Sequence, residues 1–308
     1  MAFTANATGT VAIDDSLILL YNEGIIFAAA PALVADQVAN VRTSINGKSE
    51  TFTKYANLAV STTALVELDD AVSVALVDSS VTITPVEQGA VVTKTRLAEL
   101  QSGGRVNTAV MYLVGQNMGA TKDKLAINAL EAGSGATVLV SDVAEASMAA
   151  TNVMDKTLVH RGYNKLSRTD IPKFNGYYFG IAHDDVLHDL KESASAGSWN
   201  DVNKYSNVMP ILQNEIGEFG GIRWLKSSQG YINTDGGATT VDTYHTYICG
   251  FNALGKVESS AGGITINPAG DKLGRFTNVG WLWTGAYGVV DASSYIKLVC
   301  ASSVGSNT

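Results

Sequence analysis

The chain has 308 residues, enough for one large domain or for two to three small ones, and its formal net charge is −8. This acidic balance excludes a dedicated nucleic-acid-binding protein with a basic footprint, although an acidic protein can still enclose nucleic acid without binding it specifically. Charged residues make up only 16% of the sequence, against about a quarter in ordinary soluble domains, which predicts that much of the surface is buried against other chains.

The N-terminus carries Asp14 and Asp15 and has no basic region before its apolar stretch, so it does not indicate a secretory signal. Cys249 and Cys300 are far apart in sequence and form neither a metal-binding spacing nor a disulfide framework. We therefore expect both to be reduced, largely buried hydrophobic residues in a reducing cytoplasm.

Residues 1–40 predict an N-terminal arm of short helices whose apolar faces lack a local partner. Asn46-Gly47 then signals a turn, and β-like runs over 49–55 and 81–95 flank a Thr-, Ser- and Ala-rich passage without a core of its own. We predict a long β-hairpin with a polar tip, which needs a partner surface because an isolated strand pair is barely stable. Its candidate inter-subunit residues are Lys48, Phe52, Lys54 and Tyr55.

A long amphipathic helix is predicted from Gly104 to Ala132, ended by Gly133-Ser134-Gly135. At 1.5 Å per residue it would be about 40 Å long. Gly115 and Gly119 lie one turn apart and predict a place of close packing, the alternative being a core helix weakened by about 1 kcal/mol per interior glycine. Polar residues interrupt the helix, so it is not a membrane span. Its apolar face comprises Val106, Val110, Leu113, Val114 and Met118.

The remainder predicts a mixed α/β lobe. Glycines 217, 220 and 221 are interpreted as a sharp turn from a helix into a strand. Predicted helices cover 144–166, 183–190 and 210–216, and predicted strands cover 177–182, 222–225, 244–251, 276–283 and 295–300.

The motifs in the sequence that could indicate catalysis or ligand binding are each incomplete. Gly250 to Lys256 has the spacing of a phosphate-binding loop, but Val257 stands where that loop needs Ser or Thr. Asp184 with His188, and Asp185 with Asp189, lie one helical turn apart, but a metal site needs a further ligand. We expect this stretch to cap a helix instead, and we predict no catalytic residue, no metal and no cofactor.

The only basic cluster in this acidic chain is formed by Arg161, Lys165 and Arg168, which share one face of a predicted helix. The cluster predicts a surface facing nucleic acid or an acidic patch on a neighbouring subunit. The alternative is an ordinary solvated helix face. Trp199, Trp224, Trp281 and Trp283 are expected to be core and interface anchors.

The order of the predicted parts is an arm, a hairpin, a long helix, a mixed lobe and closing strands. This order resembles that of the major capsid proteins of tailed double-stranded DNA bacteriophages, whose shell fold is shared with herpesviruses. The passages Tyr177 to His183 and Pro210 to Trp224 resemble the central lobe of those proteins, and Gly280-Trp281-Leu282-Trp283 fits a closing strand. The resemblance covers nearly the whole chain and rests on order and spacing.

The resemblance implies an α+β capsid fold with five parts. These are an arm (1–40) that clasps neighbours, an extended β loop (41–78) over the adjacent subunit, a peripheral domain (79–175) with spine helix 104–132, an axial domain (176–275) at the capsomer centre, and closing strands (276–308) that return to the peripheral domain. Some relatives crosslink a loop lysine to a neighbour's asparagine. Lys48 and Lys54 lie in the loop, but we predict no crosslink. The chain also lacks a long helical N-terminal scaffold segment, so we expect a separate scaffolding protein or prior removal of such a segment.

The implied function is structural and non-enzymatic: self-assembly into hexamers and pentamers of an icosahedral shell around double-stranded DNA. The expected partners are further copies of the chain, scaffolding, portal and decoration proteins, and DNA bound without sequence specificity, with no membrane. The expected location is the virion capsid, assembled in the host cytoplasm. Two alternatives stay open: a cellular nanocompartment shell around protein cargo, or a β-rich hydrolase or carbohydrate-binding protein using Asp184, Asp185 and Asp235.

Overall fold

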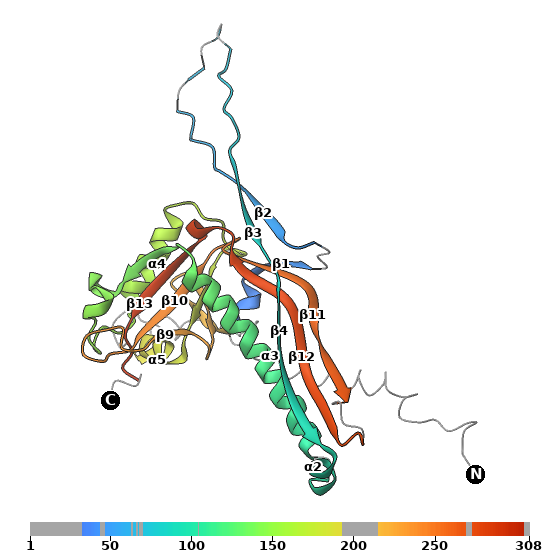
Figure 1. The fold of residues 1–308 in the computed structure, drawn as a ribbon. Helices are drawn as coiled ribbons and strands as arrows, with labels where there is room; N and C mark the ends of the chain where they lie inside the picture. The colour runs from blue at the N-terminus through green and yellow to red at the C-terminus, as the bar shows by residue number, and fades with distance from the viewer. Residues whose placement is uncertain are drawn as a thin grey trace, which may run out of the picture.

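The structure is a computed structural model that describes residues 33–43, 47–62, 64, 65, 67, 70–103, 105–192, 215–268 and 273–304 (Figure 1). The predicted arm up to residue 32, Asn46, Gly104, Trp199 and the predicted helix over 210–214 lie outside these residues. In chain order the elements are η3 (Ala35–Gln37), β1 (Ala39–Thr43), β2 (Glu50–Tyr55), β3 (Asp78–Ile83), β4 (Val86–Thr95), α2 (Arg96–Gln101), α3 (Arg105–Ala132), β5 (Ala136–Leu139), η4 (Val140–Asp142), η5 (Glu145–Ser147), α4 (Lys156–Ser167), β6 (Tyr178–Ala182), α5 (Asp184–Glu192), β7 (Glu215–Phe219), β8 (Ile222–Lys226), β9 (Tyr231–Asn233), β10 (Thr243–Cys249), β11 (Leu254–Pro268), β12 (Phe276–Val289), η6 (Ala292–Ser294) and β13 (Tyr295–Cys300).

A four-stranded sheet in the order β1-β11-β12-β4 forms one elongated half of the molecule, which we call the peripheral sheet. The long helix α3 runs along it (Figure 1). Val110, Val114 and Met118 of α3 pack against alternate residues of β12, namely Val279, Trp281 and Trp283. The predicted long helix is therefore confirmed, but Leu113, predicted on its apolar face, is 60% exposed.

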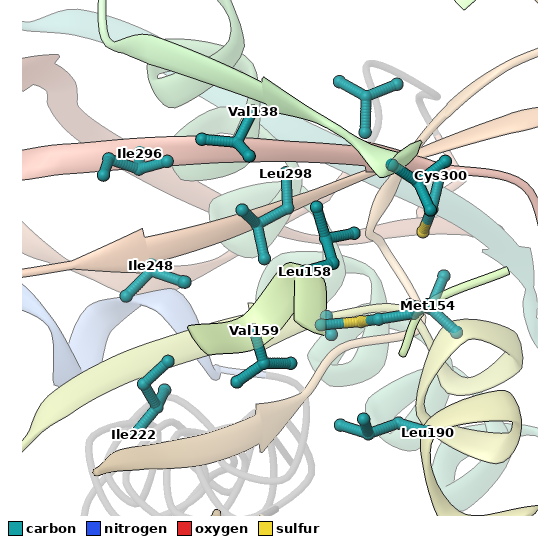
Figure 2. Close-up of a cluster of buried hydrophobic side chains, with 14 of the residues drawn as sticks. Val138, Met154, Leu158, Val159, Leu190, Ile222, Ile248, Ile296, Leu298 and Cys300 are labelled. Carbon is teal, nitrogen blue, oxygen red and sulfur yellow. The ribbon is translucent and has the colours of Figure 1, made fainter. Parts of the chain in front are cut away.

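A seven-stranded sheet forms the other half, which we call the axial sheet. Its order is β5-β13-β10-β6-β8-β7, with β9 paired to β10. Helices α4 and α5 contribute to the core on one face, where Leu158 and Val159 lie among Ile248 and Leu298 (Figure 2). The other face packs against Ile127 and Leu130 of α3. Every residue of β6 and β10 is buried because the sheet is covered on both faces.

Strands β2 and β3 form a separate antiparallel pair, with Lys54 opposite Ser79 and Tyr55 opposite Asp78. The last backbone hydrogen bond towards the tip joins Ala56 N to Val77 O at 2.9 Å. Beyond it the chain extends away from the body of the molecule (Figure 1). We call residues 56–77 the extended loop.

Two sequence predictions were wrong in detail. The predicted helix over 144–166 begins only at Lys156, because Asp155 caps it by accepting the Leu158 N–H at 2.8 Å. Residues 215 and 216 belong to β7 rather than to a helix. The turn after β7 joins two strands, and Gly220 and Gly221 occupy it with φ of 65° and 75°, a backbone region that favours glycine.

Candidate assembly surfaces

The extended loop exposes all of its described residues. Val60 is 86% exposed and Val72 is 92% exposed. Each apolar side chain left in water forgoes about 25 cal/mol per Å² of free energy that burial would release. Within the described residues of this subunit, the loop has no covering surface. The large apolar side chains exposed along it are Leu58, Val60, Leu65, Val72, Val74, Leu76 and Val77.

The base of the loop, in contrast, is fixed to the body. Phe52 of β2 is only 3% exposed and packs with Ile83, Val257 and Val290. Glycine in β11 makes room for it, since a Cβ on Gly255 would lie 3.1 Å from Cζ of Phe52. The loop is thus free along its length but rooted in a small hydrophobic core.

An ion pair adds to this root. Nζ of Lys54 lies 2.5 Å from Oδ1 of Asp291, which also caps η6 by accepting the Ser293 N–H at 2.9 Å. Burial alone would raise the pKa of Asp291, but the hydrogen bonds from Lys54, Ser293 and Ser294 outweigh it and lower that pKa. The Asp291 carboxyl therefore stays ionised to a lower pH than an ordinary aspartate does.

Four residues before the extended loop were predicted to contact another subunit, and they divide into two groups. Phe52 and Lys54 are used inside the subunit, whereas Lys48 and Tyr55 are exposed. Lys54 and Tyr55 also line a groove of about 550 Å³ between the loop base and the Thr169–Pro172 segment. Whether Lys48 and Tyr55 contact a neighbour remains a prediction.

The predicted basic face on α4 borders a second groove, of about 410 Å³, between α4 and β5. Nη1 of Arg161 donates to the Leu139 carbonyl at 3.3 Å, and Nζ of Lys165 donates to the Thr137 carbonyl at 3.2 Å. Arg161 also pairs with Asp142. Arg168 is exposed. Two of the three cations therefore hold the helix to a strand of the same subunit.

Both predicted close-packing glycines, Gly115 and Gly119, are buried on α3. Their neighbours Val114 and Met118 belong to the core between α3 and β12. Burial is the condition that the close-packing prediction requires, and the crossing element remains a proposal.

A buried ionic cluster that the sequence did not reveal joins residues 34–36, which lie within the predicted arm (1–40), to the core and to α3. Oδ1 of Asp123 accepts the N–H groups of Val34 (3.1 Å) and Ala35 (2.7 Å). Nζ of Lys256 lies 2.8 Å from Asp36 and 3.2 Å from Glu258. Burial raises the pKa of the Asp123 carboxyl. The described end of the predicted arm therefore has a local partner after all, because Val34, Ala35 and Val38 are buried in the subunit's own core.

A second ionic cluster joins the C-terminal end of α3 to the axial sheet. Nδ1 of His245 lies 2.9 Å from Glu131, and Nε2 lies 3.0 Å from Glu145. Lys297 and Tyr247 also bind Glu131, each at 2.7 Å. Burial alone would raise the pKa of Glu131, but the hydrogen bonds from His245, Lys297 and Tyr247 lower it to about 2. The helix end and the sheet are therefore locked by charge as well as by packing.

The acids considered for chemistry are dispersed among structural contacts. Asp184 pairs with Lys226 at 2.9 Å, and Asp185 accepts the Tyr244 hydroxyl at 3.0 Å. Asp189 accepts the Ser303 N–H at 3.0 Å. Nδ1 of His183 accepts the Asp185 N–H at 3.3 Å, as expected of a residue capping α5.

The described residues contain neither a metal-binding cluster nor a membrane-spanning helix. Across these parts of the chain, no three His, Cys, Asp or Glu side chains gather as a metal site would require. None of the helices that the structure describes combines the length and apolar character needed to span a membrane. Both cysteines are free and buried, and burial raises the pKa of the Cys249 thiol to about 12.

Comparison with models of protein families and with curated proteins gave no match. Solved structures, however, share the fold. The capsid of Ralstonia phage GP4 superposes with a TM-score of 0.72 at 15% identity, covering 88% of each chain. The head of Helicobacter pylori bacteriophage KHP40 gives 0.63 at 12% identity, covering 86% of this chain and 90% of that one.

The capsid of a native GTA particle gives a TM-score of 0.59 at 13% identity, covering 89% of this chain and 91% of that one. These similarities extend over most of each chain. The chain therefore has the α+β fold of phage capsid proteins, as the sequence resemblance implied.

Proposed function

We propose that this chain is a major capsid protein that self-assembles into the hexamers and pentamers of an icosahedral shell around double-stranded DNA. The observation that carries the proposal is the extended loop: its described residues are all exposed, and it projects from a fold shared with phage capsids. Exposed apolar side chains gathered in this way mark a surface that interacts with another molecule. In a shell, the partner is another copy of the chain.

The role is structural rather than enzymatic, and the location is the virion capsid after assembly in the host cytoplasm. Scaffolding, portal and decoration proteins are further partners in this proposal, and the enclosed DNA is bound without sequence specificity. The net charge of −8 supports enclosure rather than tight DNA binding. The fold does not favour the hydrolase or carbohydrate-binding alternative. Of the three acids named for it, Asp184 pairs with Lys226 and Asp185 accepts the Tyr244 hydroxyl, whereas Asp235 lies on another element, in the turn after β9.

The sheets suggest revised domain limits within this proposal. Strand β11 lies in the peripheral sheet, so we place the end of the axial domain near Gly250 rather than at residue 275. Strand β5 and helix α4 belong with the axial sheet and its core, so we assign 136–175 to the axial rather than the peripheral domain. The spine helix still forms the link between the two.

The test is direct. The chain is expressed alone and imaged by negative-stain electron microscopy over a range of salt and crowding conditions. We expect closed shells or free capsomers. A monodisperse monomer at high concentration under every condition would contradict the proposal. Particles recovered from the native source separate the alternatives, since DNA inside favours the capsid and protein cargo inside favours the nanocompartment.

A further inference from the structure

The axial sheet has an edge that another chain could extend. Strand β5 lies at the end of the sheet, and among the strands that the structure describes it pairs only with β13. An edge strand presents backbone groups that can pair with a strand of another molecule, which leads to wrong association. A subunit that must meet many copies of itself at high local concentration is especially exposed to this error.

Two cations of α4 occupy this edge. Lys165 and Arg161 donate to the carbonyls of Thr137 (3.2 Å) and Leu139 (3.3 Å), which are the acceptors that an incoming strand would use. The two carbonyls are two residues apart and so lie on the same side of the strand. The two cations are four residues apart and so lie on the same face of the helix.

The packing of α4 places the cations there. A Cβ on Gly162 would lie 2.7 Å from Cδ1 of Ile248 and 2.9 Å from Cδ2 of Leu298, so a side chain here would have to displace these methyl groups, and the glycine lets the helix lie close to β10 and β13. Leu158, Val159 and Leu166 are buried on the same helix and fix its rotation. The contact between the basic side chains and the edge is therefore part of the packed structure.

The edge of the peripheral sheet differs. Strand β4 is ten residues long, and it exposes Val86, Val91 and Val92. Apolar side chains on an edge strand favour association rather than oppose it. These two edges thus differ: β5 is short and has basic side chains bound to its carbonyls, whereas β4 is long and exposes three valines.

We propose that Arg161 and Lys165 block the β5 edge against strand pairing with a second copy, so that subunits associate through their other surfaces. The inference rests on the proposed function, because assembly is what brings copies together. It replaces the prediction of a basic face turned towards DNA for these two residues. Arg168 takes no part in it.

The test compares two variants of the full chain. Arg161→Met together with Lys165→Met removes both donors but keeps an unbranched side chain and a high helix propensity. Arg168→Met makes the same kind of change at the exposed neighbouring position and is the matched control. Assembly products are followed by analytical ultracentrifugation and electron microscopy, with a dye that reports intermolecular β-structure.

We expect the double variant to lose most of its closed shells to irregular, dye-binding aggregates, whereas Arg168→Met and the conservative Lys165→Arg assemble like the parent. Equal shell yields for the double variant and for Arg168→Met would overturn the inference. If the double variant fails to fold, Lys165→Met alone decides by the same criterion.

Failure of the proposed function looks different: the parent itself then forms no shells. In that case the inference is judged on the soluble subunits. Faster dye-binding aggregation of the double variant than of Arg168→Met supports it, and equal rates reject it.

Discussion

At the scale of single residues, β2 contains a natural pair for separating stability from assembly. Phe52 and Tyr55 are both aromatic and three residues apart, but Phe52 is 3% exposed and Tyr55 is 59% exposed. We expect Phe52→Ala to lower the free energy of unfolding of the unassembled subunit by about 3–5 kcal/mol, because it leaves a cavity among Ile83, Val257 and Val290. We expect Tyr55→Ala to change it by less than about 0.5 kcal/mol.

Denaturant unfolding of unassembled subunits measures both variants. The same preparations are then tested for assembly, where Tyr55→Ala is expected to reduce shell yield although its stability is normal. A Tyr55→Ala variant as destabilised as Phe52→Ala would show that the exposed ring is part of the subunit's own core.

Glu131 gives a residue-scale prediction about pH. Its folded pKa of about 2 lies below the ordinary glutamate value of 4.5. The resulting stabilisation is fully present above pH 4.5 and is lost as the pH falls through the folded pKa. We expect Glu131→Gln to cost about 1–3 kcal/mol at pH 7, and we expect this difference to shrink progressively as the pH falls below 4.5 and to be lost near pH 2.

Unfolding free energies of the parent and of Glu131→Gln, measured from pH 7 to pH 2, check this. Glu67→Gln on the exposed loop is the control and should show no such pH-dependent difference. If the difference in unfolding free energy between the parent and Glu131→Gln disappears already near pH 4.5, then His245 and Lys297 do not bind the Glu131 carboxylate when the protein is in solution.

At the scale of elements, the extended loop can be removed without touching its root. Ala56 and Val77 are hydrogen-bonded across the hairpin, so residues 57–76 can be replaced by Asn-Gly, a dipeptide that favours a tight turn. We expect the folded subunit to keep its stability because the loop's described side chains make no buried contact. We expect closed shells to be lost.

Circular dichroism and thermal unfolding test the fold, and electron microscopy tests assembly. A loop of full length with Val72, Val74 and Leu76 changed to Ser is the companion variant, and it should also fail if apolar contact is the cause. Unfolded protein, or normal shells from the shortened chain, would contradict the role given to the loop.

The elements also show what the sequence could predict. The long helix, the closing strands and α5 follow from apolar periodicity and from capping, which are local signals. The start of α4 was misplaced because apolar residues continue before Asp155, where the cap overrides them. The glycines near 220 predicted a turn. That the turn connects two strands depends on the pairing between β7 and β8, which periodicity does not reveal.

At the scale of the whole molecule, the ionic junctions escaped sequence analysis altogether. Lys122 and Asp123 are among the polar residues that interrupt the predicted long helix, yet they are 3% and 2% exposed. Their partners lie 136 residues away at Glu258 and 104 residues away at Ser227. Only folding brings such groups together. The same holds for Arg161 and Lys165, whose basic pattern was visible but whose acceptors are backbone carbonyls of another element.

The exposed loop has a consequence for inheritance. If another copy covers the loop, one gene encodes both sides of that contact. A mutation in the loop then changes the loop of every subunit, and a mutation in the receiving surface changes that surface in every subunit. Changes between residues 56 and 77 are then tolerated when a second change arises elsewhere in the same chain. Among related sequences, loop positions should therefore covary with positions that they never touch within one subunit, and those distant partners would map the surface on which the loop lies.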